Sequence, residues 1–133
     1  METEDQGAAK GLVDIHAHGQ EPDDLITAID KFQSEVIGGG CSIDSPLREL
    51  ITTVYQSFQY QEYLMETSKY PLNDIHTMEH NRIMSSMVHA MTRFEEGDLT
   101  MGQIIERLRV MFRVHAENFD VVLFDYFRKK YSS

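Results

Sequence analysis

Apolar residues recur at helical spacing in four successive segments of this 133-residue chain, and this period constrains the fold more than any other feature. No stretch alternates at a period of two for long enough to predict a sheet. Most of the connections between the segments are short, which places consecutive helices side by side in opposite directions. The sequence therefore predicts an all-α, up-down-up-down four-helix bundle.

Start and stop signals place the first two predicted helices. Pro22 fits the first turn of a helix that ends at the glycine run 38–40. Ser45 and Pro46 form the second start signal.

The last two predicted helices begin at capping residues. Asn73 or Asp74 caps the third, which runs to about residue 94. Thr100 and Gln103 match a capping box at the start of the fourth. Helical spacing gives the four inward faces, in chain order, as Leu25, Ile29, Phe32, Val36; Leu47, Leu50, Val54, Phe58, Leu64, Met65; His76, His80, Ile83, Met87, Met91, Phe94; and Ile104, Leu108, Met111, His115, Phe119, Val122, Tyr126.

Composition and charge narrow the class of protein. A formal net charge of −10 disfavours nucleic acid and anionic membrane surfaces as partners. No apolar run approaches the roughly 20 residues that span a bilayer. The single cysteine, Cys41, cannot form an intrachain disulfide, which fits a reducing compartment. We therefore expect one cytoplasmic domain, with residues 1–21 as a flexible polar tail and 22–133 as the bundle.

Three histidines fall on the inward faces of the third and fourth predicted helices. His76 and His80 are i, i+4 neighbours on one face, and His115 lies on the apolar stripe of the next helix. Imidazoles in a core have no water to solvate them and need partners. Three neutral imidazoles are good ligands for iron, zinc or copper, so a metal ion is the partner that would use them together.

Asp120 is a candidate fourth ligand on the helix that carries His115. A five-residue step places the two about 140° apart around a regular α-helix. They therefore reach one ion either from opposite flanks of the face or where the helix is locally wound wider. In the alternative interpretation, Asp120 is a solvated acid at the edge of the bundle and the histidines are packing residues.

Other polar residues lie outside this ligand set. Ser57 and Gln61 share the inward side of the second helix and predict either a hydrogen-bonded layer in the core or a pair at its margin. His89 lies half a turn off the apolar stripe and is expected at the surface. His16 and His18 precede the first helix.

The run from Phe58 to Met65 is followed by Tyr70-Pro71, by His76-x-x-x-His80 and later by His115-x-x-x-x-Asp120. In order and spacing these motifs resemble the hemerythrin family, including its single-domain bacterial members. The resemblance covers most of the chain after the first predicted helix start. It implies the same bundle and a non-haem di-iron site that binds oxygen reversibly.

In that family, five histidines and two bridging carboxylates hold the two irons. The resemblance implies that one iron takes His76, His80 and His115, and that Asp120 is a bridging carboxylate.

This chain departs from the family pattern at the second iron. The family's second-helix histidine falls on Ser57, its bridging glutamate on Gln61, and its first-helix histidine at or near Pro22. An amide, a hydroxyl and a proline compensate cationic charge poorly, so a normal two-iron centre is not expected.

Two routes would rescue the second iron. Glu62 is adjacent to Gln61, but a one-residue step turns it about 100° away from the site. His18 lies about one turn upstream of the lost position, and a folded-back N-terminal segment would bring it or His16 to the cavity.

Three functions follow from these alternatives. The first is a protein with one non-haem ion, iron or zinc, that senses oxygen, another small diatomic or redox conditions rather than carrying oxygen. The second is a di-iron oxygen-binding protein with substituted ligands. The third is a metal-free bundle whose acidic surface serves a protein partner or self-association. Because no nucleophile–base pair is visible, an enzyme is the least supported class.

Overall fold

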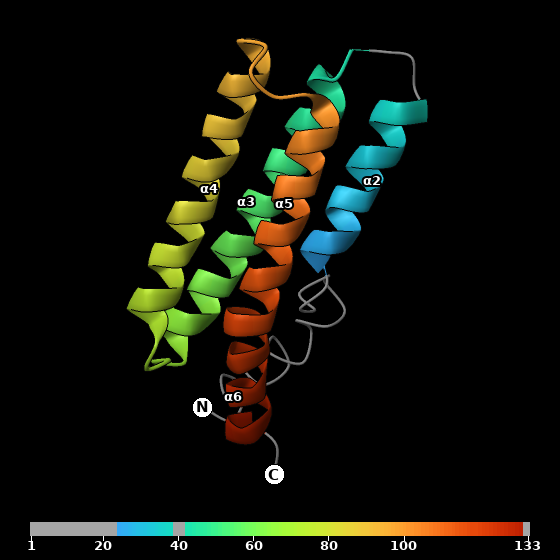
Figure 1. The fold of residues 1–133 in the computed structure, drawn as a ribbon. Helices are drawn as coiled ribbons and strands as arrows, with labels where there is room; N and C mark the ends of the chain where they lie inside the picture. Colours follow the sequence, from blue (N-terminus) through green and yellow to red (C-terminus); the bar gives the residue numbers. More distant parts are fainter. Residues whose placement is uncertain (1–23, 39–41, 132–133) are drawn as a thin grey trace.

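The computed structural model describes residues 24–38 and 42–131, and its regular structure within these ranges is entirely helical (Figure 1). The elements are α2 (Asp24–Gly38), α3 (Asp44–Thr67), α4 (Asn73–Glu95), α5 (Met101–His115), a π-helical turn η1 (Ala116–Asp120) and α6 (Val121–Tyr131). Because α5, η1 and α6 follow one another without a break, they form one long rod. The predicted all-α four-helix bundle is confirmed.

Figure 1 shows the chain ascending α2, descending α3, ascending α4 and descending the α5–η1–α6 rod. None of the helices in the described ranges has both the length and the apolar character needed to cross a membrane. The predictions for residues 1–21, including His16 and His18, and for Pro22 lie outside the described residues.

The helix starts agree only in part with the capping predictions. The capping box is confirmed, because the Thr100 hydroxyl accepts from the Gln103 backbone N–H while the Gln103 side chain accepts from that of Thr100. The predicted cap at Asn73 or Asp74 is wrong: α4 begins at Asn73, and Leu72 occupies the cap position without a side-chain bond. The Asn73 carboxamide instead accepts a hydrogen bond from the Thr77 hydroxyl.

A layer of buried polar residues divides the core into two apolar parts. The larger apolar cluster joins α2, α3, α4 and α5, and it includes Ile29, Val54, Ile83 and Ile104, all at 0% exposure. The smaller aromatic cluster joins α3, the following loop and α6: Leu64, Met65, Tyr70, Leu123, Phe124 and Phe127. The polar layer lies between the two clusters. Its residues are Ser57, Gln61, His76, His80, His115 and Asp120.

The π-helical turn changes which residues of α6 face inward. Helical spacing predicted Val122 on the buried face, but its side chain is 43% exposed, so this prediction is wrong. The extra residue in the wider turn advances the buried stripe by one position. Leu123, Phe124 and Phe127 are therefore buried, and Tyr126 lies at the margin.

Candidate metal centre

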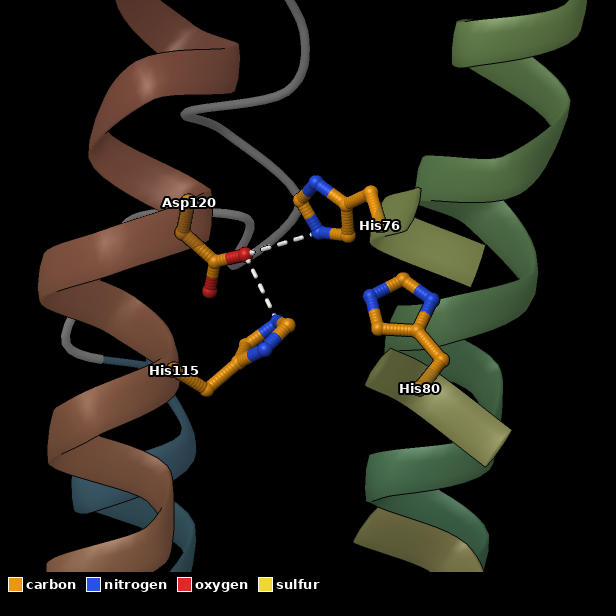
Figure 2. A group of neighbouring side chains, drawn as sticks. All are labelled: His76, His80, His115 and Asp120. Carbon is orange, nitrogen blue, oxygen red and sulfur yellow. Dashed lines mark ion pairs between the residues drawn. The ribbon is translucent and has the colours of Figure 1, made fainter. Parts of the chain in front are cut away.

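Four buried side chains from two neighbouring rods converge on one point in the polar layer (Figure 2). His76 and His80 come from α4, His115 ends α5 and Asp120 ends η1. One ligand atom from each lies within 4.8 Å of the others. That separation is close to the roughly 4 Å between two ligands on opposite sides of one ion. The structure thus brings all four predicted ligands together.

The π-helical turn η1 brings Asp120 into this group. In a regular α-helix, a five-residue step would rotate its side chain well away from that of His115. Residues 116–120 form a π-helical turn, and Asp120 Oδ1 lies 3.0 Å from His115 Nε2. The same oxygen lies 3.3 Å from His76 Nε2. Of the two geometries that the spacing allowed, the locally widened helix is the one present.

Gln61 lies on the opposite side of the two α4 imidazoles. Its Oε1 is 3.1 Å from His76 Nε2 and 2.9 Å from His80 Nε2. The side chain of Gln61 is buried at 3% exposure, so Gln61 belongs to the predicted hydrogen-bonded layer, while Ser57 is 9% exposed and lies where this layer meets a groove.

Aromatic rings fix the orientation of two of the imidazoles. The ring of Phe58 stacks on His80 with centroids 3.8 Å apart and planes inclined by 6°. Phe119 stacks on His115 at 5.4 Å and 13°. Such contacts restrict rotation about the side-chain bonds, so the inner ring nitrogens are held toward the common centre.

Glu62 holds His80 from outside the cluster. Its Oε2 lies 2.8 Å from His80 Nδ1, so the expectation that Glu62 turns away from the site is wrong in one respect. The one-residue step does keep it out of the centre, but its long side chain reaches the outer edge of the ring. In the sequence, the signal for this contact is an acidic residue, Glu62, directly after the inward-facing Gln61. A carboxylate at Nδ1 favours the tautomer with the proton on Nδ1, which leaves Nε2 free to bind a metal.

Burial keeps His76 and His80 neutral. The pKa of His80 is lowered to about 2, mainly by desolvation and in smaller part by the neighbouring His76 and His115. Desolvation also lowers the pKa of His76 against the raising effect of Asp120. Burial acts to raise the pKa of Asp120, but His115 and His76 outweigh it and hold that pKa at about 2. His76 and His80 are therefore neutral and Asp120 is a carboxylate, the forms that coordinate metals.

Several buried polar atoms of this cluster have no hydrogen-bond partner. Asp120 Oδ1 and His115 Nε2 are close, but their geometry is not that of a hydrogen bond, and both remain unsatisfied. The Nδ1 atoms of His76 and His115 are also unsatisfied. A buried polar atom without a partner costs about 1–3 kcal/mol, so each needs an explanation. An ion at the convergence point would satisfy both of the inward-facing atoms, and the donor set fits it.

The described remnants of a second site, Ser57, Gln61 and Glu62, do not add a second group of candidate metal ligands. Among the described residues, His76, His80, His115 and Asp120 are the one group that could hold a metal. Ser57 instead lines a groove of about 660 Å³ between α2 and α3, near Asp24 and Tyr60. His89 is exposed, as its position off the apolar stripe predicted.

Comparison of the chain with protein-family models, with curated proteins and with solved structures finds no match. The resemblance to hemerythrins therefore stays an expectation, and the case for this site rests on its own geometry.

Proposed function

We propose that this protein binds one non-haem metal ion at His76, His80, His115 and Asp120, and that the bound ion serves oxygen or redox sensing rather than oxygen carriage. Iron is the proposed metal, with zinc as its main competitor. The observation that carries this proposal is the convergence of four buried ligand atoms, two of them without any hydrogen bond.

The donor set decides the chemistry. Three imidazole nitrogens and a carboxylate suit Fe(II), which would keep open coordination positions for a small diatomic, or Zn(II) in a closed tetrahedral site. Bound Fe(II) would supply a redox-active centre that responds to oxygen or nitric oxide.

The surrounding residues have separate roles in this proposal. Glu62 fixes the proton of His80 on the outer nitrogen, and Phe58 and Phe119 hold two rings in place. Asp120 supplies the negative charge that offsets part of the charge of the cation. The apolar clusters on both sides of the layer exclude water from it.

One ion is favoured over two by the shortage of ligands. A second iron would need anionic ligands near Ser57 and Gln61, but the carboxylate of Glu62 is directed to the outer edge of His80. The di-iron alternative then depends on His16 or His18, which lie outside the described residues.

A specific contact favours a second candidate function, a metal-free interaction protein. The Gln61 amide oxygen is within hydrogen-bonding distance of both α4 histidines, so in a metal-free protein it would accept from Nε2–H of His76, and from that of His80 if that ring carried its proton on Nε2 rather than on Nδ1. It leaves His115 Nε2 and Asp120 Oδ1 without partners, which is why we rank this candidate below the metal protein.

Elemental analysis with an absorption spectrum in air separates these functions. The protein is purified, supplied with Fe(II) or Zn(II) under anaerobic conditions, and freed of excess metal. About one ion per chain without oxo-bridge absorption supports the proposal, and two irons with that absorption support the di-iron alternative. No retained metal supports the metal-free candidate.

A further inference from the structure

An elongated groove runs between the outward faces of α4 and α5, two helices that contact each other in the bundle. Two adjoining hollows of about 640 Å³ and 560 Å³ share Arg82, Arg107 and Met111 in their walls. We define the α4–α5 groove by these three residues together with His89, Arg93 and Val114. None of the four proposed metal ligands lines it.

The residues along the groove follow helical spacing. On α5, Gln103, Arg107, Val110 and Val114 lie three or four positions apart and so form one outward stripe. This stripe extends about 16 Å along the helix axis. Val110 and Val114 are 49% and 44% exposed, so apolar surface faces solvent here. A long, shallow, partly apolar channel of this kind matches the surface that receives an amphipathic helix.

The charge of the groove is opposite to that of the whole chain. The chain carries a net charge of −10, yet three arginines and a single carboxylate, Glu106, line the two hollows. Arg82 pairs with Glu79 on its own helix. The side chains of Arg93 and Arg107 form no hydrogen bond or ion pair with the described residues. Two uncompensated guanidinium groups beside exposed apolar surface favour a ligand with acidic and apolar faces.

From this spacing and charge we infer that the α4–α5 groove binds an acidic amphipathic helix of a partner protein. Apolar residues of the partner contact Val110, Met111 and Val114, and its carboxylates pair with Arg93 and Arg107. A second copy of this chain fits the groove less well, because a two-fold contact would place these arginines against their own copies. This inference is independent of the metal proposal.

A designed peptide tests the inference with the full chain. The probe is a fluorescein-labelled 18-residue helix with leucine at i, i+3, i+4 and i+7 and glutamate on the flanks; the matched probe has lysine in place of each glutamate. Fluorescence anisotropy should show binding of the acidic peptide and at least about tenfold weaker binding of the basic one.

Protein variants locate the binding surface. Arg107→Glu should weaken binding of the acidic peptide about tenfold or more. Arg113→Glu makes the same charge change at an exposed position of α5 outside the groove, and it should leave binding near the parent value. Far-UV circular dichroism and the melting temperature show that both variants are folded.

Four results of the peptide assay would overturn the inference. They are equal binding of the two peptides, equal loss of peptide binding in the two variants, no peptide binding at millimolar protein, and displacement of the peptide by inorganic phosphate at the same concentration as the peptide. Self-association that Arg107→Glu abolishes would assign the groove to a contact between copies of this chain and would overturn it as well.

Discussion

The larger apolar cluster and the polar layer beside it are equally buried, but they are held together in different ways. Ile104 and His115 are both 0% exposed and lie on the same helix. Burial of Ile104 is favourable whatever apolar neighbours surround it, because the hydrophobic effect has no direction. Burial of His115 is favourable only if specific atoms meet its two nitrogens, and neither has a hydrogen bond.

This difference separates stability from function within one bundle. An apolar core tolerates exchange of side chains that conserve volume, so many sequences would build it. The polar layer weakens the fold unless its donors and acceptors are satisfied, and a sequence retains such residues most readily at functional sites. Variants that alter one region and leave the other intact test this division.

The largest expected effect is on stability and comes from the apolar cluster. Phe112→Ala removes a side chain that is 0% exposed and should lower the free energy of unfolding by about 3–5 kcal/mol. Urea denaturation measures the change. The fraction of the variant that remains folded should still bind metal, and loss of metal from that fraction would contradict the division.

The next effect is on metal affinity and comes from the polar layer. His80→Ala should lower affinity by more than the roughly 10–100-fold expected for loss of an outer partner, because a ligand atom itself is removed. Competition with a chelator measures the affinity. His89→Ala, on the exposed face of the same helix, is the matched control. Parent-like affinity in His80→Ala would show that our ligand set is wrong.

A smaller loss should follow from Glu62→Gln. The amide keeps the length of the side chain but not the charge that fixes the proton on His80 Nδ1, so affinity should fall roughly tenfold. Glu66→Gln, one turn along α3 and exposed, provides the comparison. If both variants bind equally well, Glu62 has no positioning role.

The smallest effect concerns acid sensitivity of the metal-free protein. An unfolded histidine takes up a proton below a pKa near 6.5, whereas burial holds the pKa of His80 at about 2 in the folded state. Between these two pKa values the unfolded chain therefore binds more protons than the folded chain. The contribution of neutral His80 to stability is thus fully present above about pH 6.5 and declines as the pH falls. One such imidazole contributes less than about 1 kcal/mol between pH 7 and pH 6. Urea midpoints measured across this range should decline less in His80→Gln.

The sequence was sufficient for the bundle and for the identity of the clustered residues. Apolar spacing identified the helices because inward residues recur every three or four positions, and the same spacing placed His76 and His80 together. For Asp120, spacing left two geometries open, since a regular helix and a widened turn are both compatible with a five-residue step.

The remaining features depend on packing that spacing does not encode. The contact from Glu62 to His80 Nδ1 requires a long side chain to bend around its helix, and Asn73 bonds to Thr77 rather than capping α4. Val122 was placed on the wrong face because a uniform helical period was carried through the π-helical turn.

That turn gives residues 116–120 an influence beyond the candidate metal centre. Rewinding it into an ordinary α-helix, with all its residues kept, would rotate everything downstream by about 100°. The side chain of Asp120 would turn away from His115, and Leu123, Phe124 and Phe127 would leave the smaller apolar cluster. The position of Asp120 in the candidate metal centre and the packing of α6 therefore depend on the same widened turn. A change in the winding of that turn would alter both.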